Sequence, residues 1–301
     1  MRRNRVGWAQ AETKENALIK LHVLASGSGG NAAIVENGRT GEGVLVDCGI
    51  CKRDFFERVA EAGFDVAMLR AVLITHDHGD HTKGLGVVLR GLAKAGVVPE
   101  VFASRAVFNA SRPVREATES VGAPVTHFVA GDALSLAGFT VRPFRTSHDA
   151  AESFGFRFDE EAVEPGAGAT AVDEPLDSLG YMTDTGTVTD EAWEALAGVR
   201  LLALECNHDV RMLETGPYPY VIKQRIASDA GHLSNDQACE ALTRLAHENL
   251  RHAVAMHVSQ ENNTYRLPRE TFEAALADEG GGRRFSTEVS VAYQSRLVSI
   301  G

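Results

Sequence analysis

Short apolar runs alternate with glycine-rich turns through the first half of the chain. Apolar runs of four to six residues bounded by Gly, Asn and Ser favour β-strands, and they occur at residues 21–25, 32–36 and 44–47. An amphipathic stretch at 53–62, followed by Gly63, predicts a helix. A further apolar run at 71–75 ends directly at His76. This alternation of strands and helices predicts an α/β protein.

The second half repeats the pattern. Strands are expected around 179–183, 199–205 and 253–256, the last ending at His257. A capping box at 234–237 opens a helix with apolar residues at helical spacing, and Pro268 starts another that stops at Gly280. Two similar halves, each with strands and then helices, favour a four-layered αββα sandwich of the α/β (α+β) class.

Two segments depart from this pattern. Residues 1–19 are polar and aperiodic, and we expect a flexible N-terminal extension. Residues 159–177 are acidic and rich in Ala, Gly and Pro, which favours a mobile surface loop. We find no segment that divides the rest, and expect residues 20–301 to form a single domain.

The composition is that of a globular protein with no membrane contact. The 301 residues are 44% hydrophobic and 24% charged, and no apolar run approaches the roughly 20 residues of a transmembrane helix. Since the N-terminal residues lack an apolar core of the signal-peptide type, we expect a cytoplasmic location. The net charge of −11 argues against gripping nucleic acid by charge alone, although bound metal ions would add local positive charge.

The run His76-Asp77-His78-Gly79-Asp80-His81 is the strongest chemical signal. It places four potential ligands within six residues at the end of a predicted strand. Neutral imidazoles and carboxylates are ligands that zinc, manganese and iron accept. We expect Gly79 to let the backbone bend so that alternate side chains reach two different metals. The run therefore predicts a metal site.

This run resembles the signature of the metallo-β-lactamase superfamily, whose members bind two metals with further ligands from later strand ends. Matching residues here are His148, Asp184 and His257. Asp47 matches the structural aspartate that braces the loop formed by residues 76–81, called the motif loop below. The resemblance implies two divalent metal ions, Zn²⁺ or Mn²⁺, with water between them as the nucleophile. It assigns His76, His78 and His148 to the first metal, Asp80, His81 and His257 to the second, and Asp184 as a bridge.

Three later segments are similar to the nuclease branch of the superfamily, which includes tRNA 3′-processing endonucleases. They are Leu204–Asp209, Gly231–Ser234 and His257–Ser259. By this match, Glu205 orients His232, and His232 acts as general acid, with Asp80 as a third catalytic residue. Through segments such as Asn207-His208-Asp209, Gly216-Pro217-Tyr218-Pro219 and Gln260-Glu261-Asn262-Asn263, the chain resembles, over residues 20–295, the YycJ/WalJ group of small cytoplasmic proteins. That resemblance implies a phosphodiesterase acting on DNA more readily than on RNA, with 5′→3′ exonuclease activity.

Several polar residues are candidate substrate contacts. Ser26, Ser28 and Asn31 lie in a glycine-rich turn whose backbone N–H groups could cradle a phosphate, or which could be a plain hairpin turn. Lys83, Lys223 and Arg225 could form a basic track or be scattered surface charges. His208 is a further candidate contact. Tyr218 and Tyr220 could stack on bases or simply pack.

Two other activities remain open at this point: a thioester hydrolase of the glyoxalase II type, which shares the metal motif, and an RNA-processing nuclease. The segment Gly231-His232-Leu233-Ser234 favours a nuclease over the thioester hydrolase, because glyoxalase-like enzymes lack it. The metal identity and the oligomeric state are not determined by the sequence.

Overall fold

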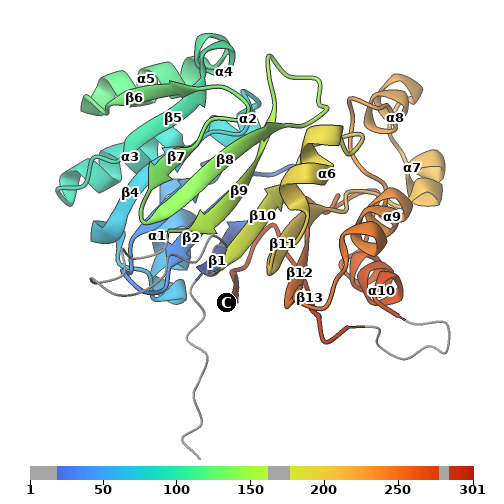
Figure 1. The fold of residues 1–301 in the computed structure, drawn as a ribbon. Helices are drawn as coiled ribbons and strands as arrows, with labels where there is room; N and C mark the ends of the chain where they lie inside the picture. Colours follow the sequence, from blue (N-terminus) through green and yellow to red (C-terminus); the bar gives the residue numbers. More distant parts are fainter. Residues whose placement is uncertain (1–18, 162–176, 278–284) are drawn as a thin grey trace, which may run out of the picture.

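The structure, a computed structural model, describes residues 19–161, 177–277 and 285–301. Within them, two seven-stranded sheets form the centre of the molecule (Figure 1). The first sheet has the order β14-β1-β2-β3-β4-β5-β6. Its strands are β1 Ile19–Ala25, β2 Ala32–Asn37, β3 Gly43–Val46, β4 Leu69–Leu73, β5 Glu100–Ser104, β6 Val125–Phe128 and β14 Val298–Ile300.

The second sheet has the order β13-β12-β11-β10-β9-β8-β7. Strands β10 to β13 run parallel to one another, whereas β7, β8 and β9 form an antiparallel meander. In the first sheet, strands β3 to β6 are the parallel part. The strands of the second sheet are β7 Leu134–Leu136, β8 Phe139–Arg145, β9 Phe154–Glu160, β10 Ser178–Met182, β11 Leu201–Glu205, β12 His252–Met256 and β13 Glu288–Val291.

Helices cover the outer face of each sheet. On the first sheet they are α1 Lys52–Ala62, α3 Leu85–Lys94, α4 Arg105–Ala110 and α5 Arg112–Val121, with the short η1 Val66–Met68. On the second they are α6 Asp190–Leu196, α9 Asn235–Leu245 and α10 Arg266–Ala275. Three shorter helices belong to loops: α2 Gly79–Thr82, α7 Val210–Thr215 and α8 Tyr220–Ile226.

The inner faces of the two sheets share one apolar core. Phe128 and Phe102 of the first sheet join Phe154, Phe156 and Tyr181 of the second in this cluster. The Phe128 ring stands edge-on to Phe154, with 5.0 Å between the ring centroids. With helices outside both sheets, the layers are αββα, so the predicted fold class is confirmed.

The predicted segment boundaries need correction at three points. Ile19 belongs to β1, and its N–H donates to Asp177 (2.8 Å), so the expected extension ends before it. Asp159 lies within β9 and pairs with Arg157. Asp177 is buried and pairs with Arg200. The loop was expected from the acidic, Ala-, Gly- and Pro-rich composition of the segment, and composition does not reveal the ion pairs of Asp159 and Asp177. The middle of the expected loop, 162–176, and residues 1–18 lie outside the described residues.

No helix in the described ranges is long and apolar enough to cross a membrane.

The glycine that shapes the motif loop is not the expected one. Gly79 begins α2 without a left-handed backbone, and a Cβ there would meet nothing within 4 Å. Gly49 lies under the loop instead, where a Cβ would come within 1.6 Å of the Asp80 carbonyl oxygen. The expectation for Gly79 is therefore wrong, because the turn is made by a short helix and the close approach occurs at a neighbouring segment.

We predict that Gly49→Ala displaces the motif loop and destabilises the protein by about 1–3 kcal/mol, as overpacking does. Gly79→Ala is the matched control in the same loop, and it should leave stability unchanged or slightly higher, because alanine favours helix. Thermal unfolding and metal content of the two purified variants check this. Equal behaviour of the two variants would contradict it.

Candidate metal centre

The predicted ligands meet because they follow the carboxyl ends of strands that point the same way. His76 follows β4, Asp184 follows β10 and His257 follows β12, each by one to three residues. Strands β8 and β10 are both antiparallel to β9 and therefore run in the same direction. His148, three residues beyond β8, thus lies at the same edge. Parallel strands end at one edge of a sheet, which is where α/β folds place their sites. The two sheets therefore present their ligands to each other.

The first group consists of His76, His78 and His148. Their candidate ligand atoms all lie within 4.8 Å of one another. Nδ1 of His78 is 3.2 Å from Nε2 of His148, while Nε2 of His78 faces the Asp149 carbonyl (3.2 Å). His76 is fully buried, and within the described chain its Nε2 has no hydrogen-bond partner. A buried acceptor of this kind is expected of a metal ligand.

The second group consists of Asp80, His81, Asp184 and His257, again with ligand atoms within 4.8 Å. Nε2 of His257 is 3.7 Å from the Asp80 carboxylate, and it too is buried and lacks a hydrogen bond to any described residue. Nε2 of His81 is 3.6 Å from the same carboxylate. Three of these four side chains are buried and Asp80 is partly exposed, so this group opens toward solvent on one side.

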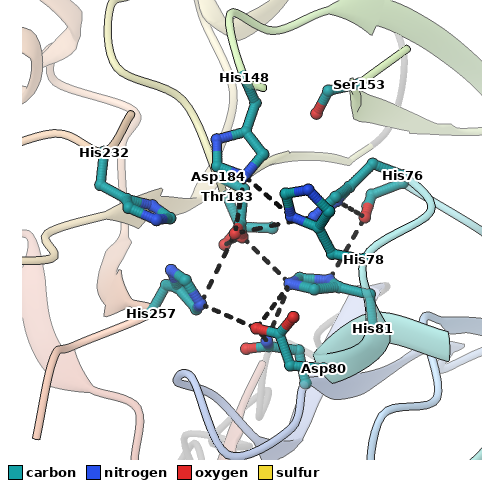
Figure 2. Close-up of polar contacts among 12 residues, drawn as sticks. His76, His78, Asp80, His81, His148, Ser153, Thr183, Asp184, His232 and His257 are labelled. Atoms are coloured by element: carbon teal, nitrogen blue, oxygen red, sulfur yellow. Dashed lines mark hydrogen bonds and ion pairs between the residues drawn. The ribbon is translucent and has the colours of Figure 1, made fainter. Parts of the chain in front are cut away.

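Asp184 stands between the two groups, as Figure 2 shows. Its Oδ2 is 3.9 Å from Nε2 of His76 and 3.8 Å from Nε2 of His148. The same carboxylate lies 3.3 Å from Nε2 of His81 and 3.6 Å from Nε2 of His257. A single carboxylate thus reaches histidines of both groups.

Four of the histidines are oriented by an oxygen at their other ring nitrogen. Nδ1 of His76 faces the Thr75 hydroxyl (2.9 Å), and Nδ1 of His148 faces the Gly231 carbonyl (2.9 Å). Nδ1 of His81 faces Asp47 (2.7 Å), and Nδ1 of His257 faces Glu205 (2.9 Å). With Nδ1 donating outward, the Nε2 lone pair faces the cluster, which is the arrangement of metal-binding histidines.

The charges of the cluster also fit cations. Burial, followed by the charge of His81, lowers the pKa of His76 well below its ordinary value, which keeps it neutral as a ligand must be. Burial works against ionisation of Asp184, yet the charges of His257 and His81 outweigh it and lower the pKa of Asp184 well below its usual range. Burial opposes protonation of His81 and His257, yet the charge of Asp184 outweighs it, raising the pKa of His81 well above its ordinary value and that of His257 to about 10. Bound metal ions would displace these protons, so the ionised carboxylates and the two orphaned Nε2 atoms suit a binuclear metal site.

Asp47 braces the motif loop from below, at the end of β3. Its carboxylate is completely buried and accepts hydrogen bonds from the Thr75 N–H (2.9 Å), the Thr75 hydroxyl (2.7 Å) and Nδ1 of His81. Its backbone has φ 57°, in the left-handed region that non-glycine residues seldom adopt. Asp184 (φ 50°) and His257 (φ 52°) share this conformation.

Glu205 joins the metal ligands to His232. Its Oε1 accepts from Nδ1 of His232 (2.8 Å) and from Nδ1 of His257, while its Oε2 accepts the backbone N–H of Thr185 and of Leu233. Burial would raise the pKa of Glu205, but the nearby His232 and these hydrogen bonds lower it to about 2. The carboxylate therefore stays ionised and fixes His232 beside the cluster.

Comparison with known proteins agrees with this geometry. Residues 43–258, most of the chain, match the family model described as a beta-lactamase superfamily domain. The chain is 33% identical over 268 residues to exodeoxyribonuclease YycJ of Bacillus anthracis, which covers 88% of this chain and 91% of that protein. It is 31% identical to exodeoxyribonuclease WalJ of Streptococcus pneumoniae, covering 89% and 92%. The chain belongs to the metallo-β-lactamase superfamily.

Solved structures share the fold at low sequence identity. YhfI of Bacillus subtilis superimposes with a TM-score of 0.64 at 17% identity, over 94% of this chain and 99% of that one. Human tRNase Z, short form, does so with a TM-score of 0.60 at 17% identity, again over 94% and 99%. The predicted relationship to the YycJ/WalJ group of metallo-β-lactamase proteins is confirmed by the curated relatives, and so is the class of metal-dependent hydrolases.

A cavity of about 300 Å³ opens over the two groups of candidate metal ligands. On one side it is lined by His78, Asp80, His148, Asp184 and His257. His232 and Asn207 also face it, together with Tyr218, Ile222, Arg225 and Ile226 around α8. The cavity thus has a charged floor and a partly apolar wall.

Of the expected basic track, one residue faces this cavity. Arg225 lines it and is held by Asp149, to which Nη2 donates (2.9 Å) alongside Nε. Lys83 donates to the Gly29 carbonyl (2.9 Å) and Lys223 to the Glu214 carbonyl (2.8 Å), and neither lines the cavity. Arg225 therefore lies at the cavity, and the two lysines lie outside it.

Of the three candidate substrate contacts in the glycine-rich turn, the structure brings one to the cavity. Ser28 lines the cavity, but Ser26 is fully buried, and its hydroxyl accepts the His257 N–H (2.7 Å). Asn31 is also buried, and its amide lies 2.9 Å from Nε2 of His81. The N–H groups of the turn's three glycines already have acceptors: Gly27 donates to Asn31, Gly29 to Gln294 and Gly30 to Gly27. Ser26 and Asn31 therefore hold the backbone of His257 and the motif loop in place.

His208 lies behind the cavity. It is buried, its Nδ1 has no partner among the described residues, and burial lowers its pKa to about 4. Its backbone carbonyl accepts the Asn235 N–H at the start of α9. The structure therefore does not place it among the cavity-lining residues, where a substrate contact was expected.

The sequence reasoning missed Asp149 and Asn207. Asp149 Oδ1 is 3.4 Å from Nε2 of His148, and its position next to a strand-end ligand was a usable signal. Asn207 lines the cavity and donates to the His257 carbonyl (2.8 Å); it follows Glu205 by two residues, just beyond β11. The same strand-end rule that identified the ligands would have found both.

We predict that Asp47→Asn weakens binding of the metal held by His81 by about 10- to 100-fold, the usual effect of losing such a partner. An asparagine N–H₂ facing Nδ1 of His81 would reverse the ring's tautomer and put a proton on the ligand atom. Metal titration of the apoprotein measures this. Asp65→Asn, an exposed capping residue that tolerates the change, is the control. Unchanged metal affinity in Asp47→Asn would contradict the assignment.

Proposed function

We propose that this chain is a two-metal phosphodiesterase that removes nucleotides from the 5′ end of DNA. The observation that carries the proposal is His232: it is held by the buried Glu205, faces the cavity and stands beside both ligand groups. The DNA substrate and the exonuclease mode rest on the curated relatives, which are named exodeoxyribonucleases.

The metals would be held as the sequence analysis assigns them. His76, His78 and His148 form the first site, Asp80, His81 and His257 form the second, and Asp184 serves both. Two divalent cations, Zn²⁺ or Mn²⁺, would lower the pKa of a bound water and neutralise charge on the phosphate. Asp80, the most exposed carboxylate of its group, faces the cavity where that water would enter.

The chain's own residues supply the proton for the leaving oxygen. Glu205 accepts the Nδ1–H of His232, so the opposite nitrogen, Nε2, points away from Glu205. Glu205 thereby fixes the ring of His232, which lines the cavity and can transfer a proton from Nε2 to a leaving oxygen. Arg225, fixed by Asp149, is placed to contact a phosphate oxygen in the same cavity.

This arrangement favours a phosphodiester over a thioester. The alkoxide released from a phosphodiester of DNA is strongly basic and needs a proton as it leaves. A thiolate leaves without one, because a thiol has a pKa of about 8.5. A histidine fixed by a buried carboxylate beside the cluster therefore serves the first reaction and adds little to the second.

We predict that His232→Ala lowers kcat on DNA by about 10²- to 10⁴-fold, the usual contribution of a general acid, while both metals stay bound. On bis(p-nitrophenyl) phosphate, whose leaving group needs no proton, the loss should be much smaller. Steady-state kinetics and metal analysis check this, with His127→Ala, a histidine outside the cluster, as control.

The candidate ligand atoms of His232, Asp184, Glu205 and His257 also lie within 4.8 Å of one another, close enough to hold a metal ion together. If His232→Ala lost a metal and lost activity equally on both substrates, His232 would be a ligand and the general-acid role would be wrong.

The proposed substrate is tested by digestion of oligonucleotides labelled at either end. Single- and double-stranded DNA and RNA, and a glutathione thioester, are offered to the apoprotein with Zn²⁺ or Mn²⁺ added back. We expect 5′ products from DNA only with metal present, and none from Asp184→Ala, in which both metal groups lose a ligand. Thioester hydrolysis without DNA cleavage would replace the proposal with the glyoxalase-type activity.

A further inference from the structure

Helix α8 presents one of its faces to the metal cavity. Ile222, Arg225 and Ile226 all line the cavity, and Tyr218 lines it from just before the helix. Residues three and four positions apart lie on the same side of a helix. The remaining residues around the cavity are polar or charged. Tyr218, Ile222 and Ile226 therefore form its one apolar side, called the apolar wall below.

The backbone at the start of the apolar wall is restricted before any ligand binds. Tyr218 stands between Pro217 and Pro219, and a residue that precedes proline is largely limited to extended conformations. Pro219 occupies the N-cap position of α8, with φ −56° and ψ 149°. Because this backbone has little freedom to lose, a ligand that packs against the half-buried Tyr218 pays a smaller ordering cost.

The other end of the apolar wall is bonded to His232, the proposed general acid. The Ile226 carbonyl accepts the His232 N–H (2.9 Å). Gly231 packs so closely against the end of α8 that a Cβ there would lie 2.2 Å from the same carbonyl oxygen. Ile226 and His232 both line the cavity. The apolar wall therefore stands on the side of the cavity from which a leaving oxygen would receive its proton.

This position identifies the part of the substrate that the apolar wall would contact. For removal of one nucleotide from a 5′ end, the oxygen that leaves beside this wall is the 3′ oxygen of the terminal nucleotide. Water adds its hydroxyl to phosphorus, the bond from phosphorus to that oxygen breaks, and the Nε2 proton of His232 passes to the oxygen. The proton that the water loses returns to His232 through solvent. The nucleotide beside His232 is thus the one released.

The size and chemistry of the cavity fit one nucleotide. Its volume of about 300 Å³ lies at the lower end of small-molecule pockets, which span roughly 300–1,000 Å³. A nucleotide combines a charged phosphate with a flat base that has apolar faces. The cavity likewise has the metal ligands and Arg225 on its floor and the apolar wall beside them. Aromatic side chains bind all four bases by stacking, because every base has such a face.

We propose that Tyr218, Ile222 and Ile226 bind the base of the terminal nucleotide, so that the cavity is a pocket for the single nucleotide that each cleavage releases. This rests on the proposed phosphodiesterase activity and names the part of the substrate that the site holds. Only the terminal base has to leave its stack, and the rest of the substrate is single- or double-stranded. The pocket therefore releases nucleotides one at a time and accepts any base.

The test removes the base from the substrate and the apolar wall from the protein. Oligonucleotides, single-stranded and duplex, have a 5′-terminal nucleotide that either carries its base or is abasic. For the wild-type protein we expect the missing base to lower kcat/KM of the first cleavage about 5- to 150-fold, the range of one base stack. An abasic nucleotide several positions inward is the control substrate, and it should leave the first cleavage unchanged.

The variants show whether this penalty arises at α8. In Tyr218→Ala/Ile222→Ala the abasic penalty should largely disappear, because the base then has little to pack against. Ile222→Ala alone should remove part of it, and it serves if the double variant does not fold. Tyr218→Phe, which keeps the ring, should retain the penalty. Val221→Ala is the matched control, since Val221 belongs to the same helix, is 74% exposed and is not among the cavity-lining residues.

Three outcomes would overturn the one-nucleotide pocket. If the wild-type protein cleaved the abasic terminus as fast as the normal one, the terminal base would not be bound. If the penalty were the same in the wild-type protein and in all the α8 variants, the base would be bound elsewhere. If the first products were oligonucleotides, the cavity would not hold the released end.

A failure of the proposed activity is distinguishable from a failure of this pocket. If the metal-loaded protein hydrolyses no phosphodiester, calorimetry still compares its binding of deoxyadenosine 5′-monophosphate and of deoxyribose 5-phosphate, which lacks the base. Tighter binding of the nucleotide, lost in Ile222→Ala and kept in Val221→Ala, would support the pocket without the activity. Equal affinity of the wild-type protein for the two ligands would overturn it.

Discussion

The structure depends on one geometric constraint: parallel strands bring their carboxyl ends to a single edge, and two sheets packed on a common core place those edges together. Strand β4 of one sheet and strands β8, β10 and β12 of the other each end within a few residues of a ligand. No single strand could assemble this cluster. The apolar packing of Phe128 against Phe154 and Phe156 therefore also determines the separation of the metal ligands.

Holding the ligands at this edge costs free energy. Asp47, Asp184 and His257 each adopt the left-handed conformation immediately beyond a strand, a class of strain worth about 1–3 kcal/mol per residue. Buried hydrogen bonds offset part of it: Thr75 and His81 donate to Asp47, and the Ser26 hydroxyl accepts the backbone N–H of His257. Metal binding would compensate further, since it favours the folded state only.

The sequence was sufficient to predict features that depend on residues adjacent in the chain. Ligands at strand ends, such as His148 and Asp184, were identifiable because a strand pattern and a polar residue are adjacent in sequence. What it did not reveal depends on distant partners. The glycine-rich turn could be a phosphate cradle or a plain hairpin turn, because nothing nearby in the sequence indicates that Gln294 accepts the Gly29 N–H. Likewise Asp177 was assigned to a loop, since its partner Arg200 is 23 residues away.

The contacts of the glycine-rich turn also have a consequence for how the protein is made. The Tyr293 carbonyl accepts the Ser26 N–H, and Gln294 holds the Gly29 N–H and the Gly30 carbonyl. Strand β14 then pairs with β1. During synthesis these partners emerge from the ribosome after every metal ligand, so the turn that supports Asn31 and the motif loop is completed only then. A nascent chain whose seven ligands have already emerged thus still lacks the support of its motif loop.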